Sequence, residues 1–346
     1  MGKMHYRCYN SMDNVQITAI CDADAEQLKN TSGVSGNISG AEQELDFSDK
    51  QLYSDLTRML AEADLDAVSI ASPTFMHASQ TIETLNSGKD VLCEKPMALN
   101  YSDCLKMVET AKKNGKCLQI GHCIRFWPEY VRAKQIIDSE QYGKILAASF
   151  QRLSLTPTWS WDNCFLDGNR SGGAMLDLHI HDTDFVQHVF GVPNEVFSRG
   201  VIGPSGDYDH TVTQYLYDDQ KVVTAEGGWI MAPEFGFEMS FKIMLEDATL
   251  LYSSAQEPTF KICPKEGEMI IPEIEDGDGY SFEIRHFVDF ISGESVHSVI
   301  TPEQSADSVK IIEAEKESVR LRTCLLYTSD AADDMQCVDL GGRRII

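Results

Sequence analysis

The feature that most constrains the fold is the alternation of apolar runs and helical segments in the first third of the chain. Strand-like and helix-like segments follow one another in the order 65–72, 77–87, 90–95, 101–114 and 117–122. Gly88 and Gly115 directly follow the two helical segments, as expected at helix ends. Strands separated by helices of this length predict a parallel sheet with right-handed crossovers.

An earlier apolar strand is expected from Val15 to Cys21, and it ends at Asp22. An acidic residue after the second strand, about twenty residues beyond a glycine loop, is how a Rossmann unit binds the adenosine ribose. Gly2 has this spacing to Asp22, but the strand and the first two glycines that should precede it are absent. We therefore expect residues 1–122 to form a Rossmann dinucleotide-binding domain that lacks its first strand.

The pattern changes at about residue 143. Strand-like segments joined by short turns then follow, at 144–154, 195–203, 210–230, 237–254 and 259–267. They predict a mostly antiparallel sheet, interrupted by one helix and followed by two helices at 279–292 and 302–321. The expected fold is thus α/β followed by α+β, with a second domain over 123–322.

The last segment, 323–346, does not continue the preceding helix. Its sequence "CLLYTSDAAD" looks like a translated sequencing adapter. We expect a non-native tail that takes no part in the fold; the alternative is an ordinary flexible terminus.

Composition excludes several classes of partner. The formal net charge of −25 argues against nucleic acids and anionic membranes, whose recognition needs clustered Lys and Arg. The chain has no apolar run near the length of a membrane span and no signal peptide at its start. Its 10 cysteines are scattered without a Cys-x-x-Cys pair, which is typical of a reducing cytoplasm. We expect a cytoplasmic protein.

The stretch "GGAMLDLHIHDTDFVQHVFGVP", residues 172–193, is rich in His and Asp and ends at Gly191 and Pro193. Its length and stop signals favour a helix. On a regular helix Asp177, His181, Asp184 and His188 fall within an arc of about 60° on one face. This face is either a solvated surface or an acid–base site.

A metal site is a further alternative for the same stretch. As a strand, it would align Asp177, His179 and His181 in the His-x-His layout of a metal site, which makes a metal-dependent hydrolase built on His179 and His181 a distant alternative. The sequence offers no third and fourth ligand at a convincing spacing, so we expect no metal. His179 is expected to pack or to cap rather than to react.

Five motifs in order carry a family resemblance: "MGKMH" (1–5), "SPTFMH" (72–77), "CEKP" (93–96), "GHCIRFWPEY" (121–130) and "GGAMLDLHIHDTD" (172–184). Over about residues 1–322 the chain resembles the glucose–fructose oxidoreductase/inositol dehydrogenase (Gfo/Idh/MocA) family. The resemblance implies a Rossmann domain followed by a domain with a large open sheet, and a nicotinamide cofactor.

The resemblance also implies site residues. The cofactor-binding positions are Gly2, His5, Asp22, Ser72, Pro73, His77, Glu94 and Lys95. Ala23 beside Asp22 favours NAD over NADP, because a 2′-phosphate needs a basic partner. The Lys95–Pro96 bond is expected to be cis.

Lys95, Asp177 and His181 are the expected catalytic residues, and Asp177 and His181 also contact substrate. Oxidation of a secondary alcohol removes the hydroxyl proton while hydride leaves the same carbon. His181 has a suitable intrinsic pKa for the proton, Asp177 is expected to orient it, and Lys95 to stabilise alkoxide charge. These groups can converge only in a cleft between the domains. Further substrate-binding candidates, with core packing as the alternative for the tryptophans, are Arg125, Trp127, Trp159 and Trp161.

The expected function is an NAD-dependent dehydrogenase that acts on CH–OH groups of a sugar or cyclic, inositol-like polyol. One alternative keeps NAD tightly bound and uses it transiently for sugar–sugar oxidoreduction or glycoside cleavage, and another is a cofactor-binding sensor without turnover. By analogy with the family's open sheet, we expect a homodimer or homotetramer.

Overall fold

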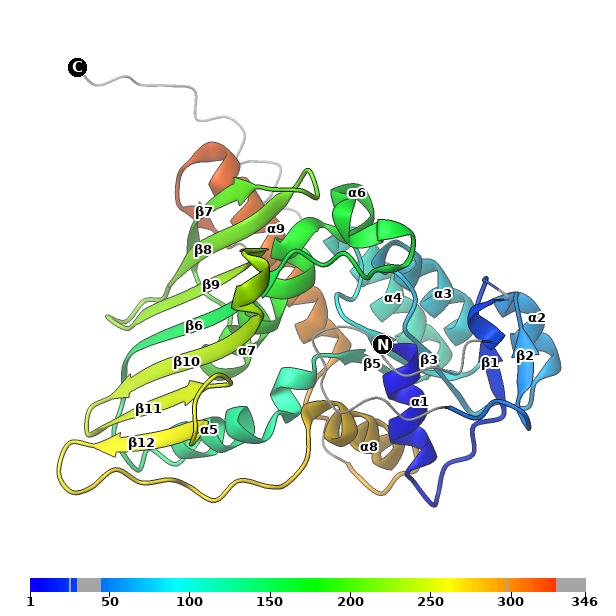
Figure 1. Ribbon diagram of the computed structural model, residues 1–346, viewed down its shortest axis with the longest axis horizontal. Helices are drawn as coiled ribbons and strands as arrows, with labels where there is room; N and C mark the ends of the chain where they lie inside the picture. Colours follow the sequence, from blue (N-terminus) through cyan, green and yellow to red (C-terminus); the bar gives the residue numbers. More distant parts are fainter. Residues whose placement is uncertain (25, 30–44, 297, 328–346) are drawn as a thin grey trace.

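The computed structural model describes residues 1–24, 26–29, 45–296 and 298–327. A smaller α/β part, formed by the N-terminal segment, lies beside a large sheet formed by the second half of the chain (Figure 1). No helix in these ranges is both long and apolar enough to cross a membrane.

The N-terminal part contains parallel strands, as predicted, but in two separate sheets. β1 (Ala19–Cys21) pairs with β2 (Gln51–Tyr53). β3 (Ala67–Ile70), β4 (Asp90–Glu94) and β5 (Leu118–Gly121) form a second sheet, in that order. Within the described ranges no ladder joins the two sheets.

Helices connect these strands. They are α1 (Gly2–Asn10), the short 3-10 turn η1 (Gln27–Lys29), α2 (Leu56–Glu62), α3 (Thr74–Asn86) and α4 (Tyr101–Asn114). The limits of α4 follow from its ends. The Asn100 side chain accepts a hydrogen bond from the Asp103 amide, and Gly115 takes the left-handed conformation that closes a helix.

The second part is an eight-stranded mixed sheet with the order β12-β11-β10-β6-β9-β8-β7-β13. Its strands are β6 (Ile145–Leu155), β7 (Glu195–Ile202), β8 (Tyr208–Leu216), β9 (Val222–Met231), β10 (Phe237–Leu245), β11 (Ala248–Ser253), β12 (Phe260–Pro264) and β13 (Leu325–Leu326). Only the central β6–β9 pair is parallel, so the predicted mostly antiparallel sheet is confirmed.

Helices cover one face of this sheet. Inward side chains of the strands form a core with α5 (Pro128–Asp138), α7 (Ile180–Phe190) and α9 (Pro302–Leu321). Burial alternates along β8 and β10, as expected for strands with one covered face. The remaining short helices are η2 (Cys123–Phe126), η3 (Trp161–Leu166), α6 (Gly168–Ser171) and η5 (Pro233–Phe235).

The two C-terminal helices return to the N-terminal part. α8 (Gly279–Ile291) packs on α1, where Ile284 and Phe287 share a core cluster with Cys8 and Met12. α9 reaches both parts of the molecule. Its residues Val309 and Ile312 lie in the core around β3–β5, whereas its Ile311 lies in the core under the large sheet.

The end of the chain differs in part from our expectation. Leu325 and Leu326, which we excluded from the fold, pair with β7 as the edge strand β13. An apolar pair can add to an open sheet edge wherever backbone groups are unpaired. Residues 328–346, the rest of the expected tail, lie outside the described residues.

Candidate active site

The turn after β4 brings a lysine from the N-terminal part to the second part. Lys95 Nζ lies 2.8 Å from the Asp177 carbonyl oxygen and 3.2 Å from its carboxylate Oδ1. The Lys95–Pro96 bond is cis, as predicted. The side chains of this pair are only 15% and 12% exposed, so water screens the pair weakly.

Glu94 directly precedes Lys95 in the chain and stabilises the same turn. Its Oε1 lies 2.7 Å from His5 Nε2, and His5 Nδ1 lies 2.6 Å from Ser69 Oγ. Burial acts to raise the pKa of Glu94, but the hydrogen bond and charge of His5, together with the Lys95 charge, outweigh it and lower the pKa. Glu94 is therefore a carboxylate that fixes α1, β3 and β4 relative to one another.

His77 joins the two turns that follow β3 and β4. Its Nε2 lies 2.8 Å from the Ser72 carbonyl and its Nδ1 2.8 Å from the Pro96 carbonyl. Burial lowers the pKa, but the Cys93 sulfur and these two acceptors outweigh burial and raise the pKa of His77 to about 9. Because carbonyl oxygens only accept, an imidazolium satisfies both contacts. His77 is fully buried and thus acts on the turns rather than on a ligand.

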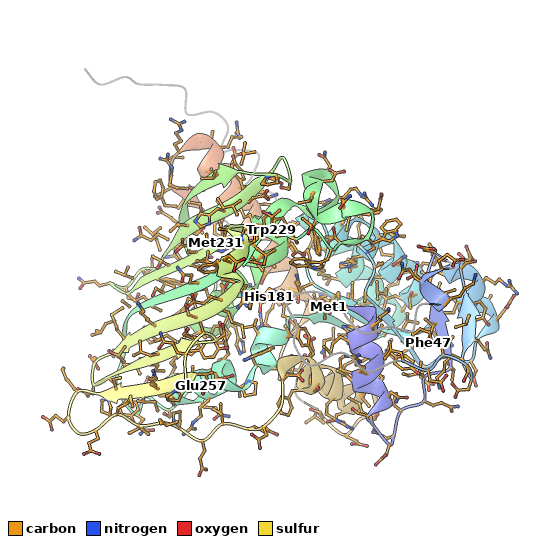
Figure 2. The ribbon with its side chains drawn as sticks, in the orientation of Figure 1. Met1, Phe47, His181, Trp229, Met231 and Glu257 are labelled. Carbon is orange, nitrogen blue, oxygen red and sulfur yellow. The ribbon has the colours of Figure 1, made fainter. Side chains whose placement is uncertain are left out.

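His181 lies between the large sheet and the N-terminal part (Figure 2). Only 9% of the residue is exposed, and Nδ1 has no hydrogen-bond partner among the described residues. Burial first, and then the charges of Lys95 and Arg152, lower the pKa of His181 well below 6.5. His181 is therefore neutral at neutral pH. The expectation that Asp177 orients it is corrected, since the Asp177 carboxylate contacts Lys95 instead.

The predicted single helical face is also corrected. Met175–His179 forms a π-helical turn before α7, which we call the π turn. The extra residue per turn shifts the angular phase between Asp177 and the residues of α7. Asp184, on α7, lies in the core, where it binds Arg125, and His188 Nδ1 lies 3.4 Å from the same guanidinium.

Arg125, expected at the substrate, is a structural residue. Its Nε and Nη2 donate to the two carboxylate oxygens of Asp184, both at 2.8 Å. Burial acts to raise the pKa of Asp184, but Arg125 outweighs it and lowers the pKa to about 2. Both side chains are fully buried. We therefore withdraw Arg125 as a sugar-binding candidate, because its fork is already engaged by a carboxylate.

The three tryptophan candidates differ in exposure. Trp127 packs edge-on against Tyr280 at 6.0 Å and belongs to the core. Trp159 and Trp161 are 37% and 49% exposed and precede the π turn in sequence. Trp161 also stacks on the guanidinium of Arg170 at 5.6 Å. Trp159 and Trp161 remain candidates for substrate contact.

The predicted cofactor residues lie at strand ends and helix starts of the N-terminal part. Asp22 is exposed after β1, and its Oδ1 accepts from the Asp24 amide at 2.9 Å. Gly2 begins α1, near the end of β3, where an added Cβ would lie 3.8 Å from that of Ala71. Pro73 caps α3, and the Ser72 hydroxyl donates to Gln80.

The start of α1 fits an anionic diphosphate. Its first turn contains no acidic residue and no capping side chain. The first internal bonds run from Met4 and His5 to the Met1 carbonyl, so the amides before them have no partner within the helix. Such helix starts bind phosphate, and an exposed carboxylate after β1 suits a ribose diol. These residues therefore match the chemistry of a dinucleotide.

Sequence reasoning missed a buried polar group around His179. The His179 ring contacts Glu315 and Tyr215 in the core. Neither partner belongs to a motif, and both are distant from His179 in sequence, so no local signal pointed to them. Within the described ranges no group of three or more His, Cys, Asp or Glu side chains is arranged to hold a metal ion.

Comparison with known proteins agrees with this architecture. Residues 1–122 match the family described as "Oxidoreductase family, NAD-binding Rossmann fold". Residues 130–251 match the "GFO/IDH/MocA C-terminal domain". The chain therefore belongs to the Gfo/Idh/MocA oxidoreductase family, as the motifs predicted.

Individual relatives are more distant. The chain is 34% identical over 156 residues to the 2,7-anhydro-N-acetylneuraminate hydratase of Mediterraneibacter gnavus. The alignment covers 44% of this chain and 41% of the relative. It is 24% identical to the myo-inositol 2-dehydrogenase of Thermotoga maritima over 278 residues, 78% of this chain and 77% of the relative. The alignments span 41% to 61% of the length of four such relatives.

Solved structures share the fold. The WlbA dehydrogenase of Bordetella pertussis, solved with NADH and UDP-GlcNAcA, has a TM-score of 0.78 and 19% identity. The match covers 95% of this chain and 96% of that chain. The likeness thus extends over both parts of the molecule.

Proposed function

We propose that this protein is an NAD-dependent oxidoreductase that acts on a secondary alcohol of a sugar or cyclic polyol. The observation that carries the proposal is the Lys95–Asp177 contact, which joins the two parts of the molecule beside a neutral, largely buried histidine. Family membership and the dehydrogenase relatives support it.

The residues divide the chemistry among them. Neutral His181 accepts the hydroxyl proton of the substrate. Lys95 donates a hydrogen bond to the same oxygen and stabilises its negative charge. Asp177 holds the ammonium group of Lys95 in place. NAD supplies the hydride acceptor when bound. The residues that would hold it are those at the start of α1, Asp22, the Ser72–Pro73 turn and Glu94.

A spectrophotometric assay with NAD and a panel of polyols and sugars tests the proposal. Turnover raises absorbance in the reduced-nicotinamide band, and Lys95→Ala or His181→Ala should lower kcat about 10²- to 10⁴-fold. Lys106→Ala is the matched control, because the Lys106 side chain on α4 is 61% exposed. The activity of this variant should stay at the wild-type level. Full turnover in both site variants would refute the assigned roles.

A second candidate function retains NAD through the catalytic cycle and uses it transiently for sugar–sugar oxidoreduction or glycoside cleavage. The hydratase relative favours this candidate, since hydration requires no net redox change. Purified protein should then release NAD on denaturation and act on an anhydro-sugar or glycoside without added cofactor. Protein that purifies free of nicotinamide contradicts it.

The open face of the large sheet supports a homo-oligomer. Side chains on the face opposite the helices include four that are 40–53% exposed, Val201, Val212, Val222 and Met244. A second copy placed there would cover these apolar side chains, with Arg199 and Glu226 beside Val212 available for polar contacts. Sedimentation should show a dimer or tetramer, and Val212→Asp should shift it toward monomer.

A further inference from the structure

The π turn determines where the second part places its two site residues. It carries Asp177, and His181 follows within two residues. Its side chains Met175 and Leu176 are fully buried in the core around β3–β5. The turn thus lies at the boundary between the two parts, and a small shift would change the Lys95–Asp177 contact.

A buried carboxylate holds the other side of this turn. Glu315 on α9 accepts hydrogen bonds at Oε1 from Tyr215 Oη at 2.9 Å and Thr183 Oγ1 at 3.1 Å. His179 Nε2 lies 3.1 Å from Glu315 Oε2. All four side chains are buried, three of them completely, so their interactions are weakly screened.

The proton positions follow from these contacts. The Tyr215 hydroxyl donates its hydrogen to Glu315, so His179 Nε2, 3.4 Å from that oxygen, must be the donor of its own contacts. The Nε2–Oε2 approach lies at ion-pair distance but outside hydrogen-bond angles, and Oε2 has no other partner among the described residues. Glu315 Oε1 is therefore the acceptor shared by Tyr215 and Thr183, and Oε2 faces the His179 ring.

Gly227 on β9 allows this close approach. A Cβ at Gly227 would lie 2.7 Å from His179 Nδ1, 2.8 Å from its Cβ and 3.0 Å from its backbone Cα. Contacts this short do not occur, so any larger residue forces the turn away from the sheet. The π turn is thus enclosed by the sheet, by α9 and by the N-terminal part.

We propose that Glu315 is a positioning residue, which acts through His179 to hold the π turn against the space left by Gly227, so that Asp177 meets Lys95 and His181 is held between the two parts of the molecule. The inference rests on the proposed function for its catalytic consequence, but the placement of the turn can be measured without turnover.

Hydrogen–deuterium exchange of the full chain tests the placement. Glu315→Gln keeps an acceptor for Tyr215 and Thr183 but removes the negative charge facing His179. Exchange over 175–181 should accelerate at least about tenfold while the N-terminal part is unchanged. Glu129→Gln is the matched control, since Glu129 on α5 is a buried carboxylate that accepts a hydrogen bond from the Thr259 hydroxyl. Exchange over 175–181 in this variant should equal that of the wild type.

The kinetic parameters distinguish a positioning role of Glu315 from a general effect on protein stability. Glu315→Gln should lower kcat about 10- to 100-fold with little change in substrate KM or in the NADH dissociation constant. Gly227→Ala should reproduce both effects. Because both substitutions displace the same turn, the double variant should lose no more than the larger single loss.

The inference would be overturned by unchanged exchange over 175–181 in both variants, or by losses that multiply in the double variant. An equal rise of exchange over the whole chain would also overturn it, since that marks general destabilisation. If the wild type turns over no substrate, the proposed function fails, while the exchange experiment still decides the role of Glu315.

Discussion

The two histidines that hold the turns around Lys95 differ in their hydrogen bonds from the histidine on the other side of the candidate site. On the N-terminal side, His5 and His77 each have a hydrogen-bond partner for both ring nitrogens. On the other side, His181 Nδ1 is buried and has none among the described residues. Buried polar groups without partners are rare and need an explanation. The difference indicates that the bonded histidines fix the turn that carries Lys95, whereas His181 has a ring nitrogen available to accept a proton.

The largest expected effect tests the N-terminal side. His77 has a folded pKa of about 9, raised above its ordinary 6.5, so protonation stabilises the fold. This stabilisation is fully present below pH 6.5 and is lost as pH rises through about 9. The full shift corresponds to about 3 kcal/mol. Urea unfolding at several pH values between 6 and 10 measures it.

His77→Gln is the control for that titration. It cannot bond both carbonyls as a cation, so the difference in unfolding free energy between wild type and variant should shrink as pH rises to about 9. A difference that does not depend on pH would show that His77 is neutral, and the proposed contrast between the two sides would weaken.

A smaller effect is expected from Glu94→Gln. The variant loses a buried carboxylate that bonds His5 Nε2 at 2.7 Å and the Lys95 amide at 3.2 Å. Charged hydrogen bonds contribute about 1.5–3 kcal/mol, so the free energy of unfolding should fall by about 2 kcal/mol. Glu62→Gln, at an exposed ion pair on α2, should cost under about 0.5 kcal/mol in the same measurement.

The smallest expected effect concerns His181 and the pH dependence of kcat/KM. Because burial and nearby cations lower the pKa of His181 well below 6.5, kcat/KM should stay level between pH 6.5 and 7.5. Its acidic limb should begin only below that range. A limb centred at or above pH 6.5 would mean that His181 has the environment of an ordinary solvated histidine.

Elements with clear end signals were predictable from sequence. The helix expected at 101–114 is observed at Tyr101–Asn114, because Asn100 and Gly115 define both ends locally. α3 begins at Thr74, three residues before the predicted start at residue 77, because Pro73 already caps the helix.

The site was predictable only as far as local motifs reach. Lys95 and Asp177 were identified from short motifs, and the structure brings them together. The π turn has no sequence signal, so the phase of Asp177 relative to the residues of α7 was predicted wrongly. Partner choice at long range, such as Arg125 with Asp184, depends on packing of elements far apart in the chain.

Helix α9 limits how the two halves of the protein can move. Since Val309 and Ile312 are buried in one core and Ile311 in the other, a clamshell hinge would have to pull an apolar stripe into water. Each such side chain costs about 1.5–3 kcal/mol to expose. If His181 is the proposed proton acceptor, we expect substrate entry and product release to depend on local shifts of loops rather than on rotation of one part against the other.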